Sequence, residues 1–217
     1  MTPERAAGAM VGCAVGDALG MPVEGWSASR IERQLGAVRE MMPGRLPAGS
    51  YTDDAQMALA LAESLLACRG VREEHLMECF VRRFEPRRGY GPGTRRVLRL
   101  WQRGVSWSEA ARATFPEGSY GNGAAMRVAP VGVAFWRDPR RLREEARRAS
   151  LVTHAHPWGW QGAVLQAGAV ATALGWSGTL DPGEFLQRLR PFAEAVSYTH
   201  LRAHETEADL VCRLLLE

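Results

Sequence analysis

The stretch Tyr51–Leu65, YTDDAQMALALAESL, starts with a hydroxyl group and two adjacent carboxylates and continues into a run of alanine, leucine and methionine. Hydroxyl and carboxylate side chains accept hydrogen bonds from the free amides at a helix start, and acids there interact favourably with the helix dipole. Met57 and Leu61 recur at the spacing of one helical face. The stretch therefore predicts a helix over about 53–68, with Gly70 as its stop signal.

Similar helix signals recur on both sides of this stretch, whereas strand signals are nearly absent. Pairs of a capping residue and a proline occur at Thr2-Pro3, Asp138-Pro139 and Asp181-Pro182. Together with apolar spacing, they predict an all-α bundle. We expect helices over about 3–20, 53–68, 72–84, 94–101, 139–152, 158–175 and 182–195, a short one opened by Ser106, and a turn and a helix within 124–136.

The first predicted helix carries a stripe of glycines. Gly8, Gly12, Gly16 and Gly20 recur every four residues, which places them on one slowly drifting face. Each glycine costs roughly 1 kcal/mol of helix stability relative to alanine. We therefore expect a close contact along this stripe, with a neighbouring helix rather than with a ligand.

The composition is that of one globular domain. The chain has 217 residues, of which 46% are hydrophobic and 24% charged, and a formal charge of +3. This small imbalance argues against nucleic acid as a partner. All 27 basic residues are arginine, and isoleucine and asparagine occur once each, which indicates a GC-rich, bacterial genome and makes an arginine-rich face weak evidence for phosphate binding.

No apolar run is long enough to cross a membrane without charges, because Arg5 and Asp17 bound the most apolar part of the first helix. We therefore expect no membrane association and no signal peptide. The four cysteines form no CxxC pair, which favours a reducing cytoplasm over a disulfide framework or a zinc site.

The end of the chain differs in character from the rest. The segment 197–217, SYTHLRAHETEADLVCRLLLE, resembles a read-through tail, and we interpret it as non-native and residues 1–196 as the domain. His200 and His204 could be drawn as a metal site, but the tail interpretation is preferred.

Two acidic segments are candidates for chemistry. Thr52, Asp53 and Asp54 offer the hard oxygen ligands that Mg²⁺ or Mn²⁺ prefers, and helix capping explains one aspartate better than two. Asp17 lies late in the first helix, where the helix dipole disfavours an anion, so we expect a compensating partner such as an arginine. Glu24 follows a turn and is, on its own, an ordinary surface acid.

Two further segments suit ligand binding. Gly121, Asn122 and Gly123 form a glycine-rich loop that could cradle phosphate, or simply a left-handed Asn-Gly turn. His154 belongs to an HxH pair without a third metal ligand. Stacking or hydrogen bonding to a ligand, or capping of the next helix by Thr153, is the better interpretation of that segment.

In this order, the segments resemble the ADP-ribosylglycohydrolase family. The similar motifs cover most of residues 4–175. They are GAMVGCAVGDALGMPVE (Gly8–Glu24), YTDDAQMALALAESL (Tyr51–Leu65), GYGPGTRRVL (Gly89–Leu98), SYGNGAAMRVAPVG (Ser119–Gly132) and SLVTHAHPWGWQGAVLQAGAVATAL (Ser150–Leu174).

The resemblance implies a single-domain orthogonal multi-helix bundle with two Mg²⁺ ions, or sometimes Mn²⁺, that cleaves the bond between ADP-ribose and a protein side chain or small acceptor. By position, Thr52, Asp53 and Asp54 match metal ligands, and Glu24 matches a catalytic carboxylate that acts near the scissile bond in some members. The residues that match the substrate site are Asp17, Gly121, Asn122, Gly123, Met126 and His154.

A second metal-ligand motif of this family, Asp-x-Asp followed by Thr or Asp, is missing from the chain. We therefore expect a truncated hydrolase that binds Mg²⁺ weakly and hydrolyses its substrate poorly or not at all. Two alternatives are a non-catalytic ADP-ribose-binding or structural member of the same fold, and a helical scaffold with chance motifs.

Overall fold

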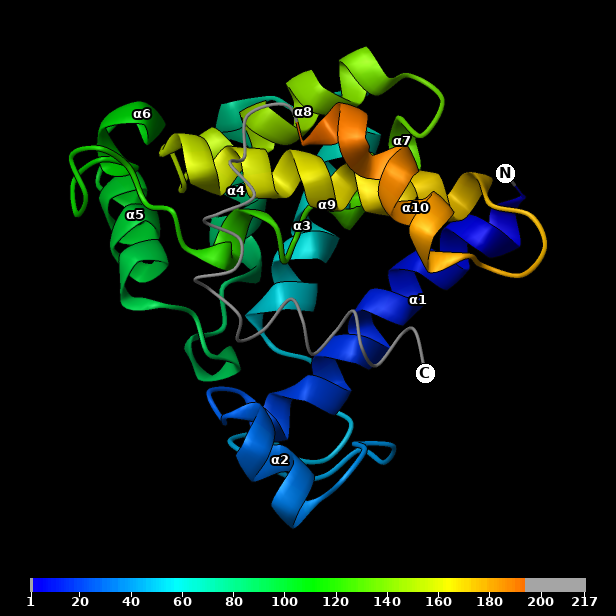
Figure 1. Ribbon diagram of the computed structural model, residues 1–217. Helices are drawn as coiled ribbons and strands as arrows, with labels where there is room; N and C mark the ends of the chain where they lie inside the picture. The colour runs from blue at the N-terminus through cyan, green and yellow to red at the C-terminus, as the bar shows by residue number, and fades with distance from the viewer. Residues whose placement is uncertain (1, 194–217) are drawn as a thin grey trace.

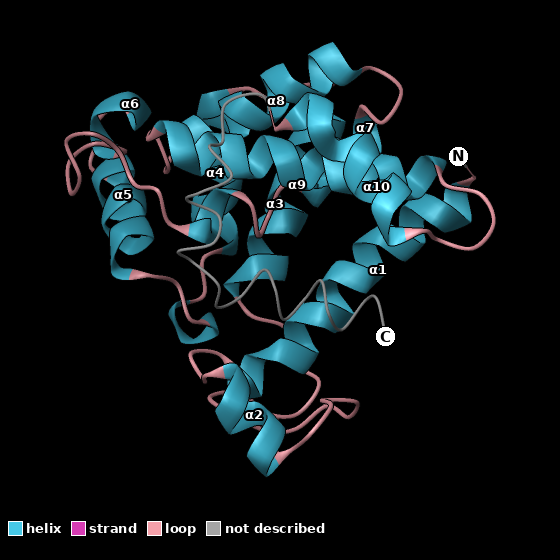
Figure 2. Ribbon diagram, viewed as in Figure 1, coloured by secondary structure: helices cyan, strands magenta, loops and turns pink. Residues whose placement is uncertain are grey.

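The computed structural model describes residues 2–193, which consist of helices and loops without a strand (Figure 2). The prediction of an all-α fold is confirmed. The helices are α1 (Pro3–Gly20), α2 (Ala28–Gln34), α3 (Asp53–Cys68), α4 (Glu73–Arg83), α5 (Pro92–Gln102), α6 (Trp107–Ala110), α7 (Ala129–Ala134), α8 (Pro139–Leu151), α9 (Pro157–Gly175) and α10 (Pro182–Leu189). Short 3₁₀ turns occupy Met21–Val23, Pro86–Arg88, Asn122–Ala124 and Arg190–Phe192.

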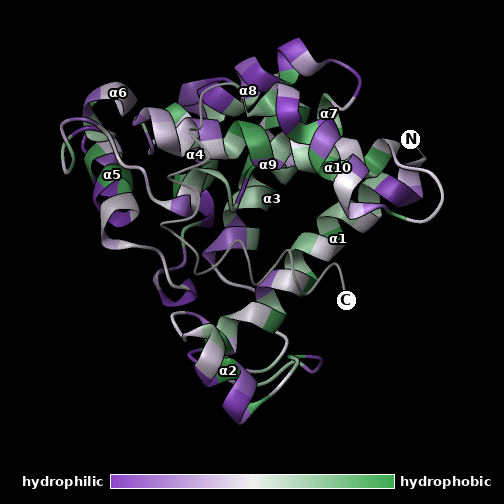
Figure 3. Cartoon of the chain, in the orientation of Figure 1, coloured by the Kyte–Doolittle hydropathy of each residue, from purple (hydrophilic) through white to green (hydrophobic). Residues whose placement is uncertain are grey.

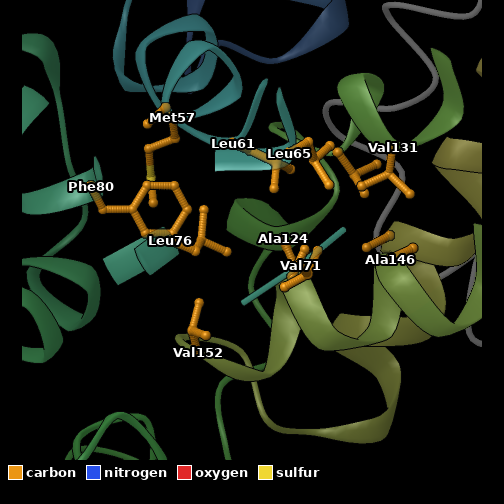
Figure 4. Close-up of a cluster of buried hydrophobic side chains, with 14 of the residues drawn as sticks. Met57, Leu61, Leu65, Val71, Leu76, Phe80, Ala124, Val131, Ala146 and Val152 are labelled. Atoms are coloured by element: carbon orange, nitrogen blue, oxygen red, sulfur yellow. The ribbon is translucent and has the colours of Figure 1, made fainter. Parts of the chain in front are cut away.

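The main hydrophobic core lies among α3, α4, α7, α8 and α9 (Figure 4). Met57 and Leu61 of α3 are buried with Leu76 and Phe80 of α4, as the apolar spacing predicts. Each such side chain contributes about 1.5–3 kcal/mol by leaving water. Ala124 belongs to the same core, so the turn that follows the glycine-rich loop is anchored there.

Most predicted helix starts are confirmed by their caps. The side chains of Thr2, Ser106, Asp138 and Asp181 each accept a hydrogen bond from a backbone amide in the first turn. The alternative in which Thr153 caps the next helix is wrong, because His156 accepts from Trp158 N at 3.1 Å and caps α9. The predicted helix over 182–195 ends earlier, at Leu189, and continues as a 3₁₀ turn.

Helix α2 was not predicted. It lies at one end of the molecule, away from the main bundle (Figure 1). Ser27 caps it by accepting from Arg30 N at 3.3 Å, and a small second core of Val23, Ile31 and Val38 holds it in place. The capping residue Ser27 could have indicated the start of α2. The apolar partners of Ile31, Val23 and Val38, lie outside the helix, so they add no helical periodicity to its sequence.

The expected contact along the glycine stripe of α1 is wrong for the described part of the chain. A Cβ added at Gly8, Gly12, Gly16 or Gly20 would meet no atom within 4 Å. Val11 is 60% exposed, and Ala18 is the one buried residue of α1. Figure 3 shows apolar and weakly polar residues along α1, in contrast to the hydrophilic residues that cover much of α8.

By length and composition alone, the segment Pro3–Val23, with a mean hydropathy of 1.4, is the one described stretch that could cross a membrane. A helix of a bundle can have the same composition, so this is weak evidence. Within the structure, α1 contacts α3, α7 and α9.

The expectations for residues 197–217, with His200 and His204, and for the domain end at residue 196 lie outside the described residues.

Candidate functional site

The start of α3 is joined to the end of α1 through Asp17. One carboxylate oxygen of Asp17 accepts from Thr52 N at 2.8 Å and from Ala55 N at 3.0 Å. Thr52 itself is the N-cap, and its hydroxyl accepts from Asp54 N at 3.3 Å. The compensating partner of Asp17 is therefore the N-terminus of α3, and the expectation of an arginine is wrong. The free amides at a helix start carry a partial positive charge, so they attract an anion as a cation would.

The two aspartates after Thr52 are held in an unfavourable environment. Burial raises the pKa of Asp53 from 3.8 to about 6, against the opposing influence of a backbone hydrogen bond and Arg45. Burial also raises the pKa of Asp54 from 3.8 to about 7, with further increases from the charges of Asp17, Asp53 and Glu24. We call these four residues, Asp17, Glu24, Asp53 and Asp54, the acidic cluster. Asp17 and Thr52 already accept the hydrogen bonds of the first-turn amides of α3, so capping that helix does not require the other three carboxylates.

Glu24 lies at the exposed side of the acidic cluster. It follows the 3₁₀ turn Met21–Val23 and forms an ion pair with Arg45. The guanidinium of Arg45 also donates to the carbonyl of Arg88 at 3.3 Å. The side chain of Glu24 remains 48% exposed, so it is a surface acid that also borders the cluster.

The donor types of the acidic cluster suit a divalent cation. Carboxylate and hydroxyl oxygens are hard ligands, and a bound cation would favour the charged forms of Asp53 and Asp54, whose pKa values burial and the neighbouring carboxylates raise. Within residues 2–193, however, no three His, Cys, Asp or Glu side chains are grouped closely enough to enclose a metal ion. Thr52, Asp53 and Asp54 would thus form one side of such a site, which is compatible with Mg²⁺ because it usually keeps several water ligands.

The glycine-rich loop is packed directly against His154. A Cβ at Gly123 would lie 2.5 Å from Cε1 of His154, and one at Gly121 would lie 3.6 Å from Nε2. Neither Asn122 nor Gly123 has a positive φ, so the alternative of a left-handed turn is wrong. Glycine is required at position 123 because the imidazole occupies the space of a side chain. The structure thus brings Gly121, Gly123 and His154 together.

The remaining predicted residues of this loop have structural contacts. Asn122 begins the 3₁₀ turn, and its carbonyl accepts from Met126 N at 3.0 Å. Met126 is partly buried and packs against the main core. Met126 therefore connects the loop to the main core.

Arg127 is a functional candidate that the sequence interpretation missed. Its side chain is 0% exposed, with no carboxylate paired to it among the described residues. It donates to Gly123 O at 2.7 Å, to Ala149 O at 2.8 Å and to Thr153 Oγ1 at 2.7 Å. In the sequence, Arg127 is the one charged residue of the apolar run that follows the loop, and this could have indicated a buried functional side chain.

Tyr90 links the acidic cluster to Arg127. Its hydroxyl donates to Gln56 Oε1 at 2.6 Å, one turn after the aspartates of α3. Burial raises the pKa of Tyr90, the charge of Asp53 raises it further, and Arg127 lowers it. One buried side chain is therefore within the electrostatic range of both parts of the site.

Exposed aromatic rings border the loop on its other side. Tyr120, His156 and Trp158 meet edge to face, with ring centroids 5.4, 5.9 and 5.1 Å apart. Tyr120 is 58% and Trp158 47% exposed. Flat, accessible rings of this kind can stack on a nucleobase.

Two cavities lie elsewhere. A groove of about 590 Å³ runs between α5 and Phe115 and includes Arg96, Arg99 and Arg103. A second, of about 220 Å³, lies in the segment 35–42. Neither contains a predicted site residue.

Comparisons with known proteins identify the family of the chain. The chain is 36% identical over 203 residues to ADP-ribosylhydrolase ARH3 of Gallus gallus, covering 86% of this chain and 54% of the relative. It is 37% identical over 158 residues to ADP-ribosyl-[dinitrogen reductase] glycohydrolase of Rhodospirillum rubrum, covering 71% and 52%. The chain thus spans about half the length of these curated relatives.

A solved structure described as an ADP-ribosylglycohydrolase-related protein complex is also similar. It shares 37% sequence identity and superposes with a TM-score of 0.68, over 91% of this chain and 64% of that one. The family model described as ADP-ribosylglycohydrolase matches residues 1–215. The chain therefore belongs to the ADP-ribosylglycohydrolase family.

Proposed function

We propose that this chain carries the substrate-facing part of a hydrolase that cleaves the glycosidic bond between ADP-ribose and a protein side chain or small acceptor, with Mg²⁺ or Mn²⁺ held by Thr52, Asp53 and Asp54. The observation that carries the proposal is the placement of Asp53 and Asp54 side by side in the first turn of α3, near Asp17 and Glu24, where burial and the like charges raise their pKa values to about 6 and about 7. Membership of the family supports the reaction class.

The chemistry needs negative charge beside a reacting sugar. Cleavage at the anomeric carbon passes through an oxocarbenium-like state, which a nearby carboxylate stabilises. Glu24 is exposed enough to meet a ligand and borders Asp53 and Asp54. Bound divalent cations supply orientation of the substrate and a lowered pKa of bound water.

The rest of the site would bind the nucleotide. The side-chain-free backbone at Gly121 and Gly123 allows close approach of a phosphate or ribose. The exposed rings of Tyr120 and Trp158 would stack on the adenine, worth about 1–3 kcal/mol per base. The proposed partner is accordingly an ADP-ribosylated protein or an ADP-ribose-containing small molecule.

A second candidate function is binding of ADP-ribose without turnover. It is favoured by one observation, that no three metal-ligating side chains are grouped among residues 2–193. The loop and the aromatic rings would bind the ligand equally well in that case.

The test measures release of ADP-ribose from a protein ADP-ribosylated on arginine, in Mg²⁺ and in EDTA. We expect release in Mg²⁺, loss in EDTA and loss with Asp53→Ala. Asp181→Ala is the matched control, because it removes an aspartate at the start of another helix, α10, without touching the site. Binding of ADP-ribose with no release under any condition would favour the second candidate, and neither binding nor release would refute both.

A further inference from the structure

We infer that Arg127 and Thr153 hold His154 in one neutral tautomer, with the ring proton on Nε2, so that His154 offers a hydrogen-bond donor to a ligand oxygen at the Gly121–Gly123 loop. The tautomer follows from contacts within this chain. The ligand contact rests on the proposed function.

The first step concerns Arg127, which can only donate. One nitrogen of its guanidinium lies 2.7 Å from Thr153 Oγ1, so the threonine oxygen accepts there. The hydroxyl has a single proton, and that proton is left for a different partner. The same arginine nitrogen donates to Ala149 O, at 2.8 Å, and this second bond fixes the direction of the guanidinium.

The second step concerns the partner of that proton. Thr153 Oγ1 lies 2.8 Å from Nδ1 of His154, and no other acceptor for the hydroxyl occurs in the described chain. The hydroxyl therefore donates to Nδ1, which must carry no proton, and a neutral ring then carries its proton on Nε2. The reverse arrangement would leave the threonine proton unpaired and turn an N–H toward a hydroxyl that already faces a cation.

The third step is the charge of the ring. His154 is 5% exposed, and both burial and the neighbouring Arg127 lower the pKa of its imidazole to about 3. The ring is thus neutral at physiological pH. A neutral ring with its proton on Nε2 is a donor on that edge, not a proton acceptor.

The last step is the position of Nε2. It lies 2.8 Å from the Cβ position of Gly123 and 3.6 Å from that of Gly121, so this edge of the ring faces the loop. Within residues 2–193 it has no hydrogen-bond partner, and it is not among the fully buried atoms that lack one. An oxygen of a phosphate or a ribose hydroxyl is the class of acceptor that would satisfy it.

Arg127 couples this donor to the loop itself. Its other terminal nitrogen donates to Gly123 O at 2.7 Å, so one buried side chain fixes both the loop and, through Thr153, the ring. Arg127 and Thr153 are therefore positioning residues, since neither reaches the surface.

The test uses the full chain labelled with ¹⁵N-histidine and reads the ring nitrogens by long-range ¹H–¹⁵N correlation, with His154→Asn to assign the signals. We expect a protonated Nε2 and an unprotonated Nδ1 in the wild type and in Thr153→Ser, which retains the hydroxyl. Thr153→Val removes it and should lose the single tautomer. ADP-ribose affinity should fall about tenfold in Thr153→Val and remain within about twofold in Thr153→Ser.

A proton on Nδ1 in the wild type overturns the inference, and so does a Thr153→Val chain with unchanged tautomer and affinity. The wild-type spectrum alone decides the tautomer, even if the valine variant fails to fold. A wild type with the Nε2 proton that binds no ADP-ribose supports the tautomer and refutes the proposed function, so the two failures are distinguishable.

Discussion

Gly123 and His154 fit each other because the imidazole fills the volume in which any other residue would have a side chain. The backbone conformation at position 123 is open to all residues, so the glycine is explained by this close approach and not by a turn. A substitution there acts on the histidine, and through it on the ligand-facing edge.

Gly123→Ala is expected to displace His154 and to weaken ADP-ribose binding by about tenfold or more, because its Cβ would lie 2.5 Å from Cε1. Gly162→Ala in α9, outside the loop, is the control, since its Cβ would meet no atom within 4 Å. Calorimetric titration with ADP-ribose measures both. Equal affinities in the two variants would contradict the proposed packing.

Helix α3 owes its start to a residue from another helix. The carboxylate of Asp17 in α1 accepts hydrogen bonds from the backbone amides of Thr52 and Ala55. Thr52 is itself the N-cap, and its hydroxyl accepts from the amide of Asp54. The negative charge at the end of α1 is thereby offset by the positive end of α3. The acidic cluster is assembled by the same contact, because α1 and α3 meet at these residues.

Asp17→Ala is expected to lower the free energy of unfolding by about 1–2 kcal/mol, since two amides lose their acceptor. Asp17→Asn keeps one acceptor oxygen and should lose less than half as much. Urea denaturation of both variants provides the measurement. An alanine variant as stable as the wild type would show that Asp17 does not hold the two helices together.

The stability of the whole chain should depend on pH through the aspartates of α3. Their pKa values in the folded chain, about 6 and about 7, lie above the ordinary value of 3.8, so the folded state binds more protons between these limits. Their contribution to stability is fully present below about pH 3.8 and is lost as the pH rises through about 6 and 7. A bound cation should restore it.

We therefore expect Mg²⁺ to raise the melting temperature at pH 8 and to have little effect at pH 5, where protons compete with it. At a concentration about one hundred times Kd, the stabilisation would be about 3 kcal/mol. Thermal melts with and without EDTA test this, with the Asp53→Asn and Asp54→Asn double variant as control. A Mg²⁺ effect that survives in the double variant would place the cation elsewhere.

Much of the architecture was predictable because neighbouring residues in the sequence determine it. Apolar spacing and capping pairs such as Asp138-Pro139 depend on residues within one or two turns, so nine of the ten helices in the described part of the chain could be recognised, with starts within one or two residues where a range was predicted. The ordered set of motifs, with Thr52, Asp53 and Asp54 followed later by a glycine-rich loop, likewise predicted the family.

The tertiary structure alone decided which of these residues touch. Thr52 and Asp17 are 35 positions apart, and Thr153 and Arg127 are 26 apart, so no local pattern announces either contact. The open face of α1 and the small core around α2 were missed for the same reason. Burial then changes chemistry that sequence cannot specify, because the removal of water raises the pKa of Asp54 and lowers that of His154.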